Sequence, residues 1–158
     1  MLPPVAEPVV GATTGCTTAL PGYFRRVREA CDRYGALLIL DEVQTGIGRT
    51  GAWFAVNHWN VVPDILTMAK GLTSAYVALG AVGVRRKIAD HFKDKVLYGG
   101  LTYNSHPLGC AAGVATLDVY EQDDLINRAR QTGAVMRGML EELKAKHSSV
   151  GDFRSIGL

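Results

Sequence analysis

An uninterrupted apolar run, Ala36-Leu-Leu-Ile-Leu40, ends abruptly at the acidic pair Asp41-Glu42. Because its residues are uniformly apolar and do not alternate with polar ones, the run is typical of a strand that is covered on both faces. Such strands occur in parallel sheets that carry helices on either side. The run therefore predicts an α/β fold.

The segments around this run alternate short apolar stretches with helical periods. Apolar residues at positions 24, 27, 31 and 34 are spaced as in an amphipathic helix over residues 21–34, and Gly35 is a typical helix stop. We expect further strands at residues 5–10, 64–69 and 79–84, a helical turn near residues 53–56, and helices over residues 106–122 and 124–147. The last helix places one apolar stripe at Leu125, Ala129, Met136, Met139, Leu140 and Leu143.

Composition and charge exclude several classes of protein. The 158 residues are 47% hydrophobic, enough for a packed core, and the net charge of +2 is not gathered into a block that would bind nucleic acid or an acidic membrane. No apolar run approaches the roughly 18 residues of a membrane span, and the first residues lack the pattern of a secretory signal. Three dispersed cysteines and four histidines without ligand spacing predict a cytoplasmic protein with no metal site.

Two charged residues follow predicted strands, where ligands bind in open parallel sheets. Asp41 ends the first apolar run, and Lys70 follows the strand that ends in Met68-Ala69. A lysine amine can condense with the aldehyde of pyridoxal phosphate, and a carboxylate can pair with its pyridinium nitrogen. Small neighbours, Ala69 and Gly71, would let a flat cofactor approach the backbone. The alternative is structural, because most charges at strand ends cap helices or face solvent.

The amino-acid sequences of several segments, in this order, resemble those of the class III, or omega, aminotransferases along essentially the whole chain. The lysine lies 29 positions (70 − 41) after the aspartate, as the family's pattern expects. The segments are Glu7-Pro-Val-Val-Gly11, Leu40-Asp-Glu-Val-Gln-Thr-Gly-Ile-Gly-Arg-Thr-Gly51, Val62-Pro-Asp-Ile65, Thr67-Met-Ala-Lys-Gly-Leu72 and Tyr98-Gly-Gly-Leu-Thr-Tyr-Asn-Ser-His-Pro-Leu-Gly-Cys-Ala-Ala112.

This resemblance implies roles for five residues and a pyridoxal 5'-phosphate cofactor. Lys70 would form the Schiff base and serve as the base, and Asp41 would pair with the pyridine nitrogen. Val43 would pack against the ring, and Gln44 would lie near its phenolic oxygen. Thr102 would donate a hydrogen bond to the cofactor phosphate of the other subunit, so that the enzyme would be a homodimer.

The resemblance also implies an incomplete fold-type I large domain, a mostly parallel sheet with flanking helices. Residues 1–150 would be its central and C-terminal part, and residues 151–158 would begin the small C-terminal domain. The family's phosphate-binding loop and ring-stacking aromatic would lie upstream, and the arginine that receives the acceptor carboxylate would lie downstream. We therefore expect this polypeptide alone to bind cofactor poorly and to turn over little or nothing.

The implied reaction is a ping-pong transfer of an amino group from an amine donor to a keto acid acceptor such as pyruvate. Ornithine- and GABA-type members carry a gating glutamate where this chain has Ala12, which favours amines, β-alanine or taurine as donors. The sequence at residues 98–103 and 57–60 most resembles that of the members that transfer an amino group from taurine or β-alanine to pyruvate.

Three other interpretations remain open. The chain could be a non-catalytic remnant or dimerisation domain of the same fold. It could also belong to an aminomutase or decarboxylase that uses the same lysine and aspartate without a keto acid. A nucleotide-binding α/β protein is the weakest of the three, because no Gly-x-Gly-x-x-Gly or Walker pattern surrounds the glycines at positions 46, 48 and 51.

Overall fold

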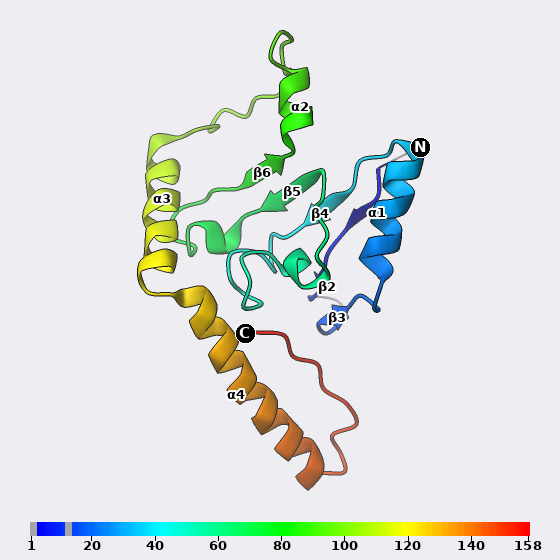
Figure 1. Cartoon of the computed structure of the whole chain (residues 1–158). Helices are drawn as coiled ribbons and strands as arrows, with labels where there is room; N and C mark the ends of the chain where they lie inside the picture. The colour runs from blue at the N-terminus through cyan, green and yellow to red at the C-terminus, as the bar shows by residue number, and fades with distance from the viewer. Residues whose placement is uncertain (1–2, 12–13) are drawn as a thin grey trace.

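The computed structural model describes residues 3–11 and 14–158. Its main sheet has the strand order β1-β4-β5-β6, formed by Val5–Ala6, Ile39–Asp41, Ile65–Met68 and Ala81–Val84. Strands β1, β4 and β5 are parallel, and β6 pairs antiparallel with β5 (Figure 1). The predicted α/β fold with a mostly parallel sheet is therefore confirmed.

The three long helices predicted from periodicity are confirmed within two residues at each end. They are α1 (Tyr23–Tyr34), α3 (Pro107–Gln122) and α4 (Leu125–Lys146). The predicted helical turn lies two residues later than expected, as the 3₁₀ helix η1 (Ala55–Trp59), and a second one, η2, spans Lys70–Leu72. The six-residue helix α2 (Arg86–His91) was not predicted, since it has no buried residue to give it an apolar period.

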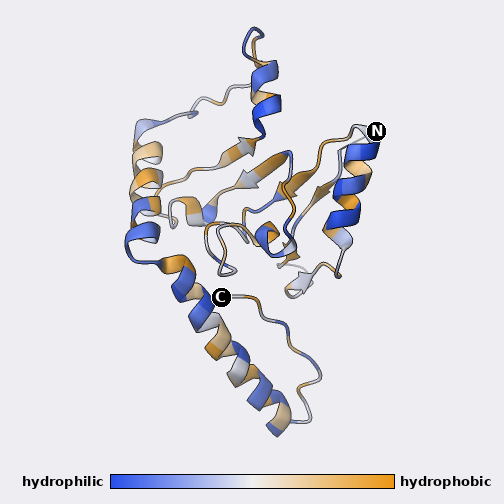
Figure 2. Cartoon of the chain, in the orientation of Figure 1, coloured by the Kyte–Doolittle hydropathy of each residue, from blue (hydrophilic) through white to orange (hydrophobic). Residues whose placement is uncertain are grey.

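Helix α1 covers the sheet where β1 and β4 lie, and its apolar side forms the core with them. Phe24 and Cys31 of the helix pack with Leu38 and Leu40, and all four side chains are almost fully buried. Figure 2 shows the strands of the main sheet as largely apolar ribbons, whereas α1 is mostly hydrophilic with apolar bands. Gly35 ends the helix at φ 65°, a left-handed conformation that favours glycine.

The prediction of one strand over residues 5–10 is wrong. Val5–Ala6 joins the main sheet as β1, whereas Val9–Val10 forms β2, which pairs antiparallel with β3 (Thr17–Thr18) in a separate sheet. Pro8 lies between the two pieces and has no N–H to donate to a sheet ladder. The chain therefore leaves the main sheet at this point.

The predicted apolar stripe on α4 is wrong at its C-terminal end, because Met139 and Leu143 are 66% and 44% exposed. The helix is instead most buried at Ala129 and Gly133. A Cβ added to Gly133 would lie 2.5 Å from the Gly157 carbonyl oxygen, so the backbone of the C-terminal segment touches the helix there. Figure 1 shows this segment returning from the far end of α4 to its middle.

Gly133→Ala is expected to destabilise the chain by about 1–3 kcal/mol, because the new methyl group would collide with backbone that cannot rotate away. Gly138 on the same helix is the matched control, since a Cβ there meets nothing within 4 Å. Gly138→Ala should stabilise the helix by up to about 1 kcal/mol. Urea unfolding monitored by circular dichroism measures both changes. Equal effects of the two substitutions would contradict the contact between Gly133 and Gly157.

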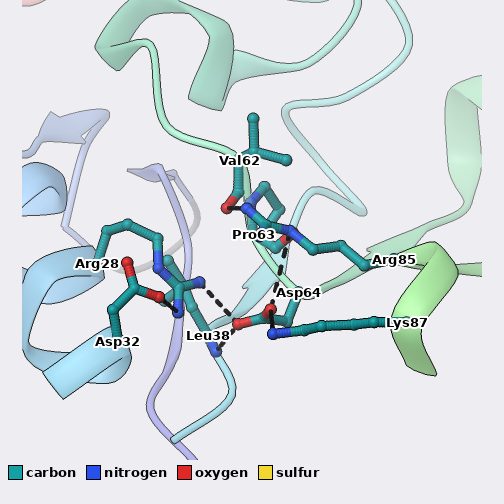
Figure 3. A network of polar contacts seen from close by, with 8 residues as sticks. All are labelled: Arg28, Asp32, Leu38, Val62, Pro63, Asp64, Arg85 and Lys87. Atoms are coloured by element: carbon teal, nitrogen blue, oxygen red, sulfur yellow. Dashed lines mark hydrogen bonds and ion pairs between the residues drawn. The ribbon is translucent and has the colours of Figure 1, made fainter. Parts of the chain in front are cut away.

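A buried carboxylate, Asp64, joins α1, β4 and the start of α2 (Figure 3). Its Oδ2 accepts hydrogen bonds from Arg28 Nη1 at 2.7 Å and from the Leu38 backbone N–H at 2.9 Å. Its Oδ1 lies 3.1 Å from Lys87 Nζ and 3.8 Å from Arg85 Nε. Three cations therefore surround a fully buried anion at the amino end of β5.

Stability should fall in acid as Asp64 is protonated. Burial raises the pKa of Asp64, but the Leu38 N–H, Arg28 and Lys87 outweigh it and lower the pKa from 3.8 to about 2. A carboxyl group with a depressed pKa stabilises the fold above pH 3.8 and loses that contribution as the pH falls toward 2. The contribution is about 2 kcal/mol at neutral pH. Urea unfolding of the native chain and Asp64→Asn between pH 2 and pH 7 should show this difference; parallel curves would contradict it.

The two edge strands of the main sheet each have one hydrogen-bonded neighbour among the described strands. Val5 of β1 and Val82 and Val84 of β6 are exposed by 66%, 64% and 45%. Exposed apolar edges of this kind invite pairing with another strand or aggregation. Within residues 3–11 and 14–158, no helix is both long and apolar enough to cross a membrane.

Candidate functional site

Asp41 and Lys70 lie at the same edge of the main sheet, where the parallel strands β4 and β5 end. Asp41 is the last residue of β4 and pairs in register with Thr67 of β5, three residues before Lys70. The Glu42 N–H continues this ladder by donating to the Thr67 carbonyl at 2.9 Å. Asp41 is half-buried, whereas Lys70 is exposed. The predicted position at the carboxyl ends of the strands is therefore observed for both residues.

The Asp41 carboxylate is oriented by the turn that follows it. Its Oδ1 accepts a hydrogen bond from the Val43 backbone N–H at 2.9 Å, a local bond that fixes the side chain relative to the strand end. In the part of the chain that the structure describes, this is the carboxylate's one recorded hydrogen bond. The second oxygen is thus left for another partner. Val43 is half-buried and Gln44 is exposed on the same turn.

Lys70 begins η2 in a left-handed conformation, with φ at 45°. This conformation is uncommon for a residue with a side chain and is found at sites where surrounding structure holds it. The next residue, Gly71, packs closely against Ile47, whose Cβ would lie 3.1 Å from an added Cβ. The small residue at position 71 therefore allows contact with the loop after β4. The sequence had instead predicted a small residue here because a cofactor would approach the backbone.

Glu42 holds this loop from inside the protein, a role that was not predicted from the sequence. Its side chain is fully buried and accepts hydrogen bonds from Thr45 Oγ1 at 2.5 Å and from the Ala55 and Val56 N–H groups at 3.0 and 2.8 Å. Burial raises the pKa of Glu42, and the three hydrogen bonds oppose that rise. Glu42 thereby ties η1 to the turn that carries Asp41. Its place in an acidic pair after an apolar strand was the available signal.

Helix α4 and the C-terminal segment hold the far end of the same loop. Arg130 of α4 donates from Nε and Nη2 to the Gly51 carbonyl at 3.2 and 2.9 Å. The Leu158 N–H donates to the Arg49 carbonyl at 3.0 Å. The glycines at positions 48 and 51 are turn residues with φ of 83° and 78°, a left-handed conformation that favours glycine. The loop is thus fixed at both ends.

The remaining predicted residues lie in different surroundings. Gln44 faces Gly11, since a Cβ on Gly11 would come 2.6 Å from Gln44 Nε2. Thr102 lies in the exposed segment between α2 and α3, and no recorded hydrogen bond joins it to Asp41 or Lys70 in the described chain. Ala12, which bears on the donor, lies outside the described residues. Among residues 3–11 and 14–158, no cluster of three His, Cys, Asp or Glu side chains could hold a metal ion.

A third polar group lies beside Asp41. The Thr67 hydroxyl is buried without a hydrogen-bond partner in the described chain, and residues paired in register point to the same face of a sheet. Thr67 and Asp41 therefore face the same side. The polar groups at this edge are a carboxylate with one oxygen that has no recorded hydrogen bond, a buried hydroxyl without a partner in the described chain, and an exposed amine. Such a set can bind a molecule that carries both a basic nitrogen and an electrophilic carbonyl.

Comparison with known proteins identifies relatives for the whole described chain. The family model for class III aminotransferases matches residues 4–158. An omega-aminotransferase of Caulobacter vibrioides is 45% identical over 160 residues, which cover 98% of this chain and 36% of that protein. A 5-aminovalerate aminotransferase of Pseudomonas aeruginosa is 38% identical over 155 residues, covering 97% and 35%.

Solved structures agree with these matches. The taurine:2-oxoglutarate aminotransferase from Bifidobacterium kashiwanohense, solved with PLP and glutamate, superposes with a TM-score of 0.92 at 44% identity and covers 97% of this chain and 34% of its own. An S-selective transaminase from Arthrobacter sp. gives a TM-score of 0.92 at 39% identity, covering 98% and 33%. The chain thus spans about a third of the length of the relatives it matches.

Proposed function

The chain belongs to the class III aminotransferases, and from this membership we propose that it is part of a transaminase that moves an amino group from an amine or omega-amino acid to a keto acid such as pyruvate. The observation that carries the proposal is the position of Asp41 and Lys70 on adjacent parallel strands, at one edge of the sheet. The cofactor of the family is pyridoxal phosphate.

The residues at the sheet edge fit this cofactor. Asp41 would hold the pyridine nitrogen through the carboxylate oxygen that the Val43 N–H does not use, and Lys70 would hold the aldehyde carbon. Val43 would pack against the ring, and Gln44 would donate to its phenolic oxygen. The orphaned Thr67 hydroxyl supports the assignment, because a buried hydroxyl without a partner is costly unless a bound molecule supplies one.

When bound, pyridoxal phosphate supplies a carbonyl that condenses with amines and a ring that accepts the electron pair of an adjacent carbon. With the cofactor bound, Asp41 would keep the ring nitrogen protonated, because a carboxylate beside that nitrogen favours its charged form. Lys70 would hold the aldehyde carbon, and its amine, once free, would take the proton from the donor's amine-bearing carbon and deliver it to the cofactor carbon that bears the nitrogen. Water would release the donor's carbon skeleton as a carbonyl product, the amino group would stay with the cofactor, and a keto acid would accept that group by the reverse proton transfer.

For the donor, we propose taurine, β-alanine or a similar omega-amino acid or amine. The alanine at position 12, where ornithine- and GABA-type members carry a gating glutamate, supports this choice. Relatives whose names specify taurine and 5-aminovalerate support it as well. These donors share a primary amine that is not on the carbon next to a carboxylate.

We also propose that the active enzyme is a homodimer in the cytoplasm and that Thr102 serves the phosphate site of the neighbouring subunit. The segment around Thr102 supports the dimer, because it exposes five large apolar side chains, Val96, Leu97, Tyr98, Leu101 and Tyr103. Residues 1–150 would form part of the large domain and residues 151–158 the start of the small one. The three free thiols, Cys16, Cys31 and Cys110, suit a reducing compartment.

The test of this function is an acceptor-dependence assay on the longest reading frame that contains residues 1–158. With taurine or β-alanine as donor, alanine should form only when pyruvate is added. Product without any keto acid would favour an aminomutase or decarboxylase. No turnover with any donor and acceptor, despite bound cofactor, would favour a non-catalytic remnant.

Asp41→Asn should lower the rate of amino transfer in that protein by about 10²–10³-fold, because a neutral amide does not hold the ring nitrogen protonated. The variant should keep its fold, since the amide oxygen can still accept the Val43 N–H. Asp118→Asn is the matched control, because that carboxylate is exposed on α3. Single-turnover kinetics with a saturating donor measure the effect. A rate within threefold of the native rate would remove Asp41 from the mechanism.

A further inference from the structure

We propose that Gly11 is a positioning residue, which sets the place of the Gln44 amide and through it the strength of cofactor binding. This inference rests on the proposed function, because Gln44 matters only if its amide meets the cofactor ring. The structural part, a contact between the two residues, can be tested without the cofactor.

The Gln44 amide lies directly against the backbone of Gly11. A Cβ on Gly11 would lie 2.6 Å from Nε2, 3.1 Å from Cδ and 3.4 Å from Oε1 of Gln44. These three atoms are the nearest neighbours of that Cβ, and all belong to the end of one flexible side chain. Gly11 does not have the positive φ that would make a side chain strained. An alanine at position 11 should therefore displace the amide while leaving the fold intact.

The backbone on both sides of Gln44 is held, so the displacement has to fall on its side chain. The Val43 N–H is bonded to Asp41, and the Thr45 hydroxyl is bonded to the buried Glu42. Gly11 approaches from the end of β2, in another sheet. Gly11 and Gln44 line the same small cavity of about 140 Å³. The other residues that line it are Val9, Cys16, Thr45, Arg49, Thr50, Ile156 and Leu158.

The end of β4 and the turn after it thus present the carboxylate of Asp41 and the amide of Gln44, and Gly11 limits where the amide can lie. A methyl group needs roughly 3.4 Å or more to an amide nitrogen, so the Gln44 Nε2 would have to move by about 1 Å. Hydrogen bonds weaken steeply when distance and angle change by this amount. We expect Gly11→Ala to weaken cofactor binding about three- to tenfold, the value of one hydrogen bond.

The contact is tested first in the 158-residue chain without cofactor. Nuclear Overhauser effects should join the Gly11 Hα protons to the side-chain amide protons of Gln44. Gly11→Ala should shift those amide resonances, and Gly151→Ala should not, because a Cβ on Gly151 meets nothing within 4 Å. Unshifted Gln44 resonances in Gly11→Ala would overturn the proposal.

The cofactor part is tested by a double-mutant cycle in the longest reading frame that contains the chain. The dissociation constant is measured from the Lys70-dependent visible absorption band in native protein, Gly11→Ala, Gln44→Ala and the double variant. If Gly11 acts through Gln44, Gly11→Ala should cause no further loss once Gln44 is alanine. An equal loss in both backgrounds would overturn the positioning role. Absence of the band in native protein would overturn both the proposed function and the effect of Gly11 on cofactor binding. The shift of the Gln44 amide resonances would still show whether Gly11 contacts Gln44.

Discussion

Lys70→Ala is expected to abolish covalent attachment of pyridoxal phosphate and to lower amino transfer at least about a thousandfold, the largest functional loss that we predict for any substitution. Two tasks fall to one amine in the proposed mechanism, holding the cofactor and moving the proton, and alanine can do neither. The fold should survive, because Lys70 is exposed and its amine makes no recorded ion pair or hydrogen bond in the described chain.

The measurement is an absorbance titration with pyridoxal phosphate, followed by borohydride reduction and peptide mapping. In the longest reading frame that contains residues 1–158, the label should map to Lys70 in the native protein and disappear in the variant. Lys95→Ala, which removes another exposed lysine, should leave the label in place. Labelling spread evenly over surface lysines in both proteins would contradict the role of Lys70.

Asp64→Ala should be the most destabilising substitution that we predict, at about 3–5 kcal/mol. The change leaves Arg28, a largely buried cation, with the exposed Asp32 in place of its buried anion, and it removes the acceptor of the Leu38 N–H. Because small domains are stable by about 5–15 kcal/mol, such a loss is a large fraction of the stability of the chain.

Chemical denaturation compares this variant with Asp152→Ala, whose carboxylate is exposed by 67% and forms only surface ion pairs. That control should change stability by less than about 1 kcal/mol. Similar losses of unfolding free energy in the two variants would show that the Asp64 network stabilises the chain no more than a surface ion pair does.

The sequence allowed prediction of the elements with a clear hydrophobic period and failed where contacts between distant segments decide. The helix over residues 21–34 was predictable because its apolar spacing and Gly35 agree. The exchange of sheets at Pro8 was not predicted, because the partner of β2 is a pair of exposed threonines without alternation. On α4, the burial of Gly133 depends on Gly157, and no local pattern reports that contact.

The candidate site follows the same rule. The position of Asp41 and Lys70 at one edge of the sheet was predictable, because each lies where an apolar strand ends and parallel strands end at one edge. Their roles toward a cofactor came from the family resemblance alone. The structural role of Glu42 was not predictable from the sequence. Its three hydrogen-bond donors come from residues 45, 55 and 56, and only the folded chain brings them together. Gly11 was likewise read as part of a motif and not as the neighbour of Gln44.

The bond from the Leu158 N–H to the Arg49 carbonyl has a consequence for biosynthesis. The two residues are 109 positions apart (158 − 49), so the loop that begins next to Asp41 cannot reach its final form on the ribosome until Leu158 has emerged. At about 5–20 residues per second, synthesis of the intervening chain takes roughly 5–20 seconds. During this interval the first strands and α1 can fold, but the glycine-rich loop lacks its bond to Leu158. Nascent chains arrested before Leu158 should therefore be cut by proteases at residues 46–51, and chains released beyond it should be protected there.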